Sequence, residues 1–183
     1  MISIPVEPPI TEYLHAKAAR QGIPLSGTFE LTPLCNMNCR MCYVRMSREQ
    51  QEAAHPLVRR DAWLDLARQA KEQGLLYLLL TGGEPLLHPD FREILTARHR
   101  MGLLVSVNTN GTLIDEEVVQ WLRQAPPVRM NVTLYGASDE TYDRLCRNPE
   151  GFTQATRAIR LLRDAGISVK LNCSLTPYNA ADL

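Results

Sequence analysis

The segment LCNMNCRMCYV holds three of the chain's five cysteines. Cys35, Cys39 and Cys42 follow one another in a C-x3-C-x2-C spacing. Thiols this close together are unlike the framework of a disulfide-rich domain, and in a reducing compartment they are more often metal ligands or catalytic groups. The other two, Cys146 and Cys173, stand alone, and we expect both to be buried as small hydrophobic side chains.

Three clustered thiolates suit iron better than zinc. A structural zinc ion takes four ligands, usually as two separated pairs, but the chain has no second C-x2-C pair and the loop contains no histidine. A 4Fe–4S cluster has four irons and normally takes four cysteines. With only three, one iron has no protein ligand and is free to bind a substrate or a second cofactor. Zinc remains the alternative.

A second group of residues lies in LLLTGGEPLLHPDF, where an apolar run leads into a GGEP turn. Gly82 and Gly83 allow the backbone to approach a ligand closely, so that its amide and carbonyl groups can bind directly. Glu84 can hold a cation. Alone, GGEP is only a turn. Because it follows a buried strand, with the cysteine loop on the neighbouring strand, we interpret it as a ligand-binding turn.

The elements that must position these residues alternate along the chain. Apolar and alternating runs predict strands at residues 28–32, 75–81, 103–108, 129–135 and 168–175. Helical stripes predict helices near residues 60–73, 91–102, 118–125 and 152–166, preceded by a helix at about 10–20. Alternating strands and helices indicate parallel strands joined by right-handed crossovers.

Side-chain alternation favours a curved sheet over an open one. Four of the five predicted strands have a polar face, as with Thr28 and Glu30 on the first or Asn131 and Thr133 on the fourth. Parallel strands covered by helices on both sides should be apolar on both faces. We therefore predict a partial (β/α) barrel with a polar interior, whose ligands lie at the carboxyl ends of the strands.

Composition excludes several other classes of protein. Twenty basic and twenty acidic residues give zero formal net charge, so there is no basic field for nucleic acid. The sequence has no apolar run long enough to span a membrane and no recognisable signal peptide, so we expect a cytoplasmic protein without a membrane partner. At 183 residues and 45% hydrophobic, the chain can bury a core of its own.

The cysteine spacing after the first strand, with GGE at the end of the second, resembles the radical S-adenosylmethionine (radical SAM) superfamily over roughly residues 28–175. The stretches CNMNCRMCY, TGGEP, NTNGTLI and VTLYGASDETYDRL are similar to the branch that carries a C-terminal SPASM or related domain and modifies peptides and proteins. Residues 1–27 lie before this resemblance, and their own pattern, with PVEPP typical of a loop, predicts a helix and a linker. The resemblance implies a radical SAM core at 28–183, an α/β partial barrel of about five strands, apparently truncated after the fifth.

The resemblance also implies a chemistry. Cys35, Cys39 and Cys42 would hold three irons of a 4Fe–4S cluster, and the methionine part of S-adenosylmethionine (SAM) would bind the fourth. One electron, from a donor such as flavodoxin or ferredoxin, would cleave SAM to methionine and a 5′-deoxyadenosyl radical. That radical would take a hydrogen from a peptide or small-molecule substrate. We expect such a cluster to be oxygen-sensitive.

By the same resemblance, ten further residues would bind the cofactor: Met41, Tyr43, Gly82, Gly83, Glu84, Pro85, Asn108, Asn110, Thr133 and Asn172. The glycines and glutamate match the motif that meets the SAM amino group. Met41 stands where the family often has an aromatic residue near the adenine, and Tyr43 follows the third cysteine. Asn110 could instead shape the turn before Gly111.

Four more polar residues have competing interpretations. Arg144 and Arg147 could reach a carboxylate or could be solvated groups at a helix end. We expect His88 to be a helix cap or a surface group, and Glu30 to make a polar contact inside the barrel. None is assigned to catalysis.

Two other functions stay open at this point. One is a radical SAM enzyme of small-molecule or cofactor biosynthesis. The other is a non-catalytic iron–sulfur or zinc protein, against which the GGEP turn and the polar barrel interior argue, because an electron carrier needs neither.

Overall fold

The computed structural model describes residues 9–182, apart from the side chains of Pro9, Arg98 and His99. Within it, a single parallel sheet has the strand order β1-β2-β3-β4-β5. The strands are β1 (Ser26–Glu30), β2 (Tyr77–Thr81), β3 (Leu104–Thr109), β4 (Arg129–Thr133) and β5 (Val169–Asn172). The predicted α/β architecture with five parallel strands is thereby confirmed.

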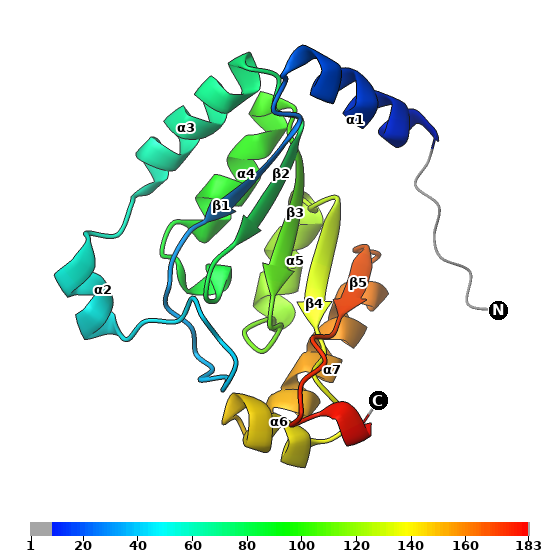
Figure 1. Cartoon of the computed structure of the whole chain (residues 1–183). Helices are drawn as coiled ribbons and strands as arrows, with labels where there is room; N and C mark the ends of the chain where they lie inside the picture. Colours follow the sequence, from blue (N-terminus) through cyan, green and yellow to red (C-terminus); the bar gives the residue numbers. More distant parts are fainter. Residues whose placement is uncertain (1–8, 183) are drawn as a thin grey trace.

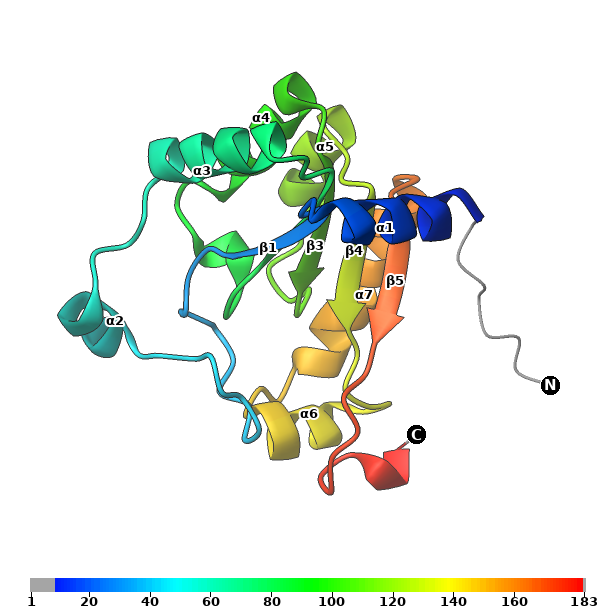
Figure 2. The same cartoon turned by 45° about the horizontal axis from the view of Figure 1, so that its top comes forward.

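The helices cover one face and both ends of this sheet. They are α1 (Pro9–Gln21), α2 (Arg48–Ala54), α3 (Arg60–Glu72), α4 (Phe91–Met101), α5 (Glu116–Gln124), α6 (Asp139–Cys146) and α7 (Gly151–Asp164), with short 3-10 turns η1 (Pro85–Leu87) and η2 (Ala180–Asp182). Figure 1 shows α4, α5 and α7 behind the sheet, α3 beside β1, α6 below the carboxyl ends of the strands, and α2 well to one side. In Figure 2, α1 crosses the end where the strands begin.

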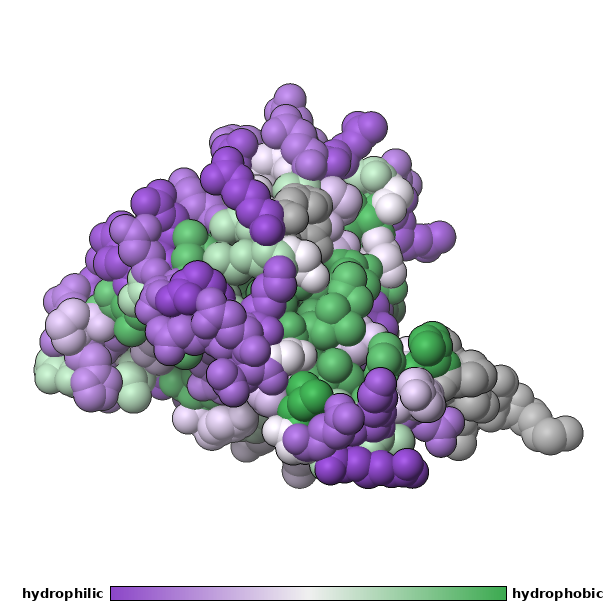
Figure 3. Space-filling model, turned by 90° about the horizontal axis from the view of Figure 1, so that it is seen from above, coloured by the Kyte–Doolittle hydropathy of each residue, from purple (hydrophilic) through white to green (hydrophobic). Residues whose placement is uncertain are grey.

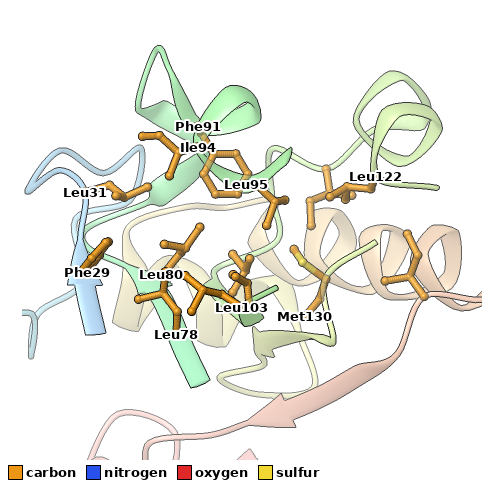
Figure 4. Packing of buried hydrophobic residues seen from close by; sticks show 14 of the residues in the cluster. Phe29, Leu31, Leu78, Leu80, Phe91, Ile94, Leu95, Leu103, Leu122 and Met130 are labelled. Carbon is orange, nitrogen blue, oxygen red and sulfur yellow. The ribbon is translucent and has the colours of Figure 1, made fainter. Parts of the chain in front are cut away.

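The hydrophobic core lies between the sheet and the helices on its covered face. Leu80 on β2, Val107 on β3 and Met130 on β4 are completely buried, and Leu122 of α5 and Leu162 of α7 pack in the same core. Figure 4 shows this layer from close by. Burying each such side chain contributes about 1.5–3 kcal/mol, so the core holds the strand order firmly.

The opposite face of the sheet is polar, as the alternation predicts. Asn131 on β4 lies beside Asn108 on β3 and donates to its Oδ1 over 2.8 Å, while Arg129 Nε donates to Asn131 Oδ1 over 2.9 Å. Glu30 is exposed on this face. Figure 3, seen from above, shows hydrophilic side chains over much of the outer surface and apolar residues toward the middle. None of the helices described is long and apolar enough to cross a membrane.

The sequence missed two helices, α2 and α6. Helix α2 (REQQEAA) has no apolar stripe, and it forms because Ser47 and Gln50 make a reciprocal capping box. Helix α6 is eight residues long and begins at a Ser138 cap. Its buried residues Tyr142 and Leu145 pack under the cysteine loop, a contact distant in sequence.

Candidate active site

A cavity of about 290 Å³ opens at the carboxyl ends of the strands. All three clustered cysteines line it, together with residues from the ends of β2, β3 and β4. The lining residues are Cys35, Met37, Cys39, Met41, Cys42, Tyr43, Val44, Thr81, Gly82, Gly83, Asn108, Thr109, Asn110, Thr133, Tyr135 and Ser174. The cysteine loop and the glycine turn therefore meet at one site.

The cysteine loop is held by the end of helix α6. The backbone N–H of Asn38 donates to the Cys146 carbonyl over 3.1 Å, and that of Arg40 donates to the Leu145 carbonyl over 2.9 Å. At the far end of the loop, Met46 N–H donates to the Pro33 carbonyl over 3.0 Å. Because helix-end carbonyls lack partners within their own helix, α6 supplies ready acceptors at this point.

N–H groups point at two of the sulfur atoms. Met37 N–H lies 3.4 Å from Cys35 Sγ, and Arg45 N–H lies 3.3 Å from Cys42 Sγ. The Asn110 side-chain amide lies 3.7 Å from Cys35 Sγ. Hydrogen bonds to sulfur favour the thiolate form, the form that binds metal. The loop thus provides donors where bound thiolates would accept them.

Burial and neighbouring groups shift the thiol pKa values in different directions. Burial raises the pKa of Cys35 to about 11, opposed by the Met37 N–H. A hydrogen bond with Cys146 lowers the pKa of Cys39, aided by the charge of Arg45, and the same bond raises the pKa of Cys146. Cys146 is buried, as predicted, and adjoins the cavity wall.

The prediction that Cys173 is buried is wrong. It is exposed just beyond the end of β5, where no helix of the described chain covers it. Its sulfur accepts from the side-chain amide of Asn179 over 3.7 Å. Cys173 does not line the cavity.

Gly82 and Gly83 line the cavity and also contact the segment that joins β1 to Cys35. A Cβ on Gly82 would collide with the Thr32 carbonyl oxygen, and one on Gly83 with the Leu34 carbonyl oxygen. Gly83 N–H donates to the Thr32 carbonyl over 2.7 Å. The glycines are required here because two backbones touch, a reason independent of any ligand.

Glu84 is completely buried behind the cavity wall and is not among the lining residues. Its Oε1 accepts from Leu86 N–H (3.2 Å) and Thr109 Oγ1 (2.9 Å), and its Oε2 accepts from Asn110 N–H (2.8 Å). Burial raises the pKa of Glu84 to about 7, although these three donors oppose the rise. The carboxylate links the turn after β2 to the end of β3.

Asn110 shapes a turn and touches the cysteine loop at the same time. Its Oδ1 accepts from the Thr112 N–H over 2.9 Å, which forms the turn expected before Gly111. Its Nδ2 donates to Asn36 Oδ1 over 2.9 Å. The end of β3 is therefore joined to the residue that follows Cys35.

The remaining predicted residues divide into two sets. Met41, Tyr43, Asn108 and Thr133 line the cavity, and Tyr43 is 93% exposed at its rim. Two others do not line it: Pro85, which is buried at the start of η1, and Asn172, which pairs with Thr133 in the sheet.

Several polar residues outside the cavity have structural contacts. His88 is buried, so its interpretation as a surface group is wrong; its Nδ1 accepts the N–H of Asp90 over 3.1 Å, just before α4. Its Nε2 lies 2.9 Å from the Val58 carbonyl oxygen. Arg144 Nε donates to the Tyr178 carbonyl over 2.9 Å and so ties down the segment after β5.

Sequence reasoning did not single out Thr109 or Tyr135, which both line the cavity. Thr109 is buried and donates to Glu84. Tyr135 lies on the polar side of the predicted fourth strand, and that alternation was the available signal. Burial raises the pKa of Tyr135, so it stays a neutral phenol.

All three thiols of the cysteine loop line the cavity. Across residues 9–182, no three His, Cys, Asp or Glu side chains are grouped so as to hold a single metal ion. In a 4Fe–4S cluster each thiolate binds a different iron, so its ligands are spread around a volume. A zinc ion needs its ligands within about 2.0–2.3 Å of one centre. The donor set fits the cluster better.

A model of the Radical SAM superfamily matches residues 29–183. The chain belongs to the radical SAM superfamily. Membership confirms the resemblance carried by the cysteine spacing and the GGE turn, and it implies a 4Fe–4S cluster and SAM as cofactors.

Relatives of this radical SAM chain include enzymes of two kinds. It is 34% identical over 167 residues to the AdoMet-dependent heme synthase of Methanosarcina barkeri, covering 90% of this chain and 46% of that protein. It is 32% identical over 158 residues to the antilisterial bacteriocin subtilosin biosynthesis protein AlbA of Bacillus subtilis, covering 86% and 34%. The chain spans less than half the length of these curated relatives.

Solved structures show the same fold. Streptococcus suis SuiB matches with a TM-score of 0.73 and 19% identity, covering 99% of this chain and 42% of that one. The structure of anSMEcpe with bound AdoMet matches with a TM-score of 0.68 and 21% identity, covering 82% and 43%. At these identities the likeness concerns the fold alone.

Proposed function

We propose that this chain is the catalytic core of a radical SAM enzyme that modifies a peptide or protein. The observation that carries the proposal is the meeting of three cysteines and the Gly82–Gly83 turn on one cavity. When bound, the cluster and SAM would supply a 5′-deoxyadenosyl radical that abstracts a substrate hydrogen. The protein's part is to bind, orient and exclude water.

Each group of residues has a separate task in this proposal. Cys35, Cys39 and Cys42 hold three irons and leave one open. Gly82 and Gly83 line the cavity, where their backbone carbonyl groups can accept hydrogen bonds from the amino group of SAM. Asn108, Thr133, Met41 and Tyr43 line the cavity and supply polar and apolar contacts for the rest of SAM.

Glu84 acts from behind the cavity wall in this proposal. Its carboxylate accepts the N–H of Asn110, which lines the cavity, so it fixes the end of β3 against the glycine turn. We therefore assign it a positioning role. Pro85, at the start of η1, and Asn172, paired with Thr133 in the sheet, also support the site from outside the cavity lining.

The relatives support a peptide substrate and also one alternative. AlbA is named for bacteriocin biosynthesis, and SkfB of Bacillus subtilis, 27% identical, is named as a sporulation killing factor maturation protein. The heme synthases favour the second candidate, an enzyme of small-molecule or cofactor biosynthesis. We further propose a cytoplasmic location, where thiols stay reduced, and an electron donor such as flavodoxin or ferredoxin.

Anaerobic reconstitution tests the proposal. The chain is loaded with iron and sulfide, and the iron and sulfide bound per chain are measured. Reduction with dithionite in the presence of SAM should then yield 5′-deoxyadenosine, and Cys39→Ala should yield none. A chain that binds zinc alone, or that binds the cluster but never cleaves SAM, would refute the proposed function. Adding candidate precursor peptides separates the peptide from the small-molecule alternative.

A further inference from the structure

One of the three clustered thiols lies against a fourth sulfur atom that the proposed cluster does not use. The thiols of Cys39 and Cys146 form a hydrogen bond with each other. Both residues belong to the same small apolar group under the cysteine loop. Cys146 is not among the residues that line the cavity. The proposed function therefore leaves the contact between these two thiols without a role.

The backbone holds the two residues together on both sides of Cys39. Asn38 N–H donates to the Cys146 carbonyl over 3.1 Å, and Arg40 N–H donates to the Leu145 carbonyl over 2.9 Å. A disulfide needs two Cα atoms roughly 4.4–6.8 Å apart and side chains that point toward each other. The paired backbones bring the residues together, and the thiol contact shows that their side chains face each other. A bond between the two sulfur atoms therefore requires little movement of the chain.

The other two clustered thiols have different partners. The sulfur atoms of Cys35 and Cys42 accept backbone N–H groups over 3.4 and 3.3 Å. From the sequence alone, the C-x2-C pair of Cys39 and Cys42 would be the expected disulfide. The structure instead places Cys39 against Cys146, which is distant in sequence.

The two thiols differ in their access to a small oxidant. Cys39 is partly buried and lines the cavity, whereas Cys146 is completely buried. Hydrogen peroxide that enters the cavity therefore meets Cys39 first, and Cys146 is placed to react with the product. An accessible cysteine beside a second, resolving cysteine is the usual arrangement of a redox-sensitive site.

We propose that Cys39 and Cys146 form a reversible disulfide when the cluster is absent. The Cys39 sulfur attacks hydrogen peroxide, the O–O bond breaks, and Cys39 sulfenic acid and water form. The Cys146 sulfur then attacks the Cys39 sulfur, so the S–S bond forms as the S–O bond breaks and a second water leaves. The two thiols lose two electrons and two protons, and the peroxide is reduced to water.

The disulfide withholds one cluster ligand and protects it at the same time. Sulfinic and sulfonic acids do not return to thiols with ordinary reductants, whereas thiol exchange opens a disulfide. In a reducing compartment the bond is therefore transient. This consequence rests on the proposed function, because it requires Cys39 to bind iron. The disulfide itself does not depend on that function.

The test starts from the metal-free, fully reduced chain and adds an equimolar amount of hydrogen peroxide. Remaining thiols are blocked with N-ethylmaleimide, and the chain is cleaved with trypsin without reduction. Cleavage after arginine separates Cys39, Cys42 and Cys146 into three peptides, residues 21–40, 41–45 and 145–147. Mass spectrometry identifies the linked peptides, and fragmentation of the first distinguishes Cys39 from Cys35.

We expect residues 145–147 to be linked to residues 21–40 through Cys39 in most of the oxidised chain. The oxidised chain should load little iron, and treatment with dithiothreitol should restore loading to the level of the untreated chain. In Cys146→Ser this link is absent, so excess peroxide should leave sulfinic acid at Cys39 and a loss of iron loading that dithiothreitol does not reverse. Cys173→Ser removes an exposed thiol outside the cavity and should match wild type.

Two results would overturn the inference. The first is a wild-type link from residues 21–40 to residues 41–45, or one within residues 21–40, because the thiol contact would then not direct the oxidation. The second is equal recovery of iron loading in wild type and Cys146→Ser after excess peroxide. The wild-type peptide map decides the disulfide even where the variant loads no iron. A wild-type chain that forms the disulfide but loads no iron when kept reduced would contradict the proposed function instead.

Discussion

The carboxylate of Glu84 accepts the backbone N–H of Asn110 over 2.8 Å. This contact joins the turn after β2 to the end of β3, and the Asn110 side chain continues to Cys35 and Asn36. The glycine turn packs in turn against Thr32. These contacts hold the carboxyl ends of β1, β2 and β3 together around one cavity.

Replacing Glu84 should weaken SAM binding without emptying the iron site. Glu84→Gln keeps the size of the side chain but loses an acceptor for the Asn110 N–H, so the end of β3 loosens beside the cavity. We expect SAM affinity to fall on the order of tenfold. The measurement is a SAM titration with iron content as the check, and Glu117→Gln, exposed on α5, is the control. Unaltered affinity would show that Glu84 has no effect on the cofactor.

Glu84 should also make the free energy of unfolding depend on pH. Burial raises its folded pKa from 4.5 to about 7, so the folded state holds a proton that the unfolded state has released between these values. Its contribution to the free energy of unfolding should therefore be largest below pH 4.5 and fall as pH rises through 7, by on the order of 3 kcal/mol.

Denaturant unfolding of the metal-free chain measures this effect. The wild-type curve minus the Glu84→Gln curve isolates it from other groups, such as Asp90, whose pKa is lowered to about 2 by Arg59 and which acts at lower pH. A difference that stays constant from pH 4.5 to 7 would contradict the buried carboxyl.

Because the glycine turn is in backbone contact with the segment before Cys35, a substitution in the turn should lower both the free energy of unfolding and the iron content. In Gly83→Ala the new methyl group meets the Leu34 carbonyl, so the chain before Cys35 must move. We expect a loss of about 1–3 kcal/mol in unfolding free energy and a reduced iron content. Gly166→Ala is a matched control, because φ there is +74° and no atom lies within 4 Å of the new Cβ. It should lose stability but bind iron normally.

Single cysteine variants should distinguish the cysteines that bind the cluster from those that do not. Cys35→Ala, Cys39→Ala and Cys42→Ala should each abolish cluster assembly, because two thiolates do not hold the cube stably. Cys146→Ala and Cys173→Ala should retain it. Iron and sulfide per chain after reconstitution measure the effect, and an equal loss in all five variants would show that the assignment of three ligands is wrong.

Much of this arrangement was predictable because its signals are local. The alternation of side chains along the strands predicts the polar face that carries Asn108 and Thr133. The spacing of the cysteines predicts the loop that lines the cavity beside them. The burial of Glu84 was not predictable, because its three donors come from residues up to 26 positions away. The prediction for Cys173 was wrong because it rested on the usual burial of isolated cysteines, whereas the structure leaves that end of β5 uncovered.

The central claim is that three thiolates hold a 4Fe–4S cluster and leave one iron open for SAM. The most direct test is the electron paramagnetic resonance spectrum of the reduced, reconstituted chain before and after SAM is added. We predict a signal from one reduced cluster per chain that changes its g values on addition of SAM. A signal of the same shape and intensity with and without saturating SAM would contradict the account.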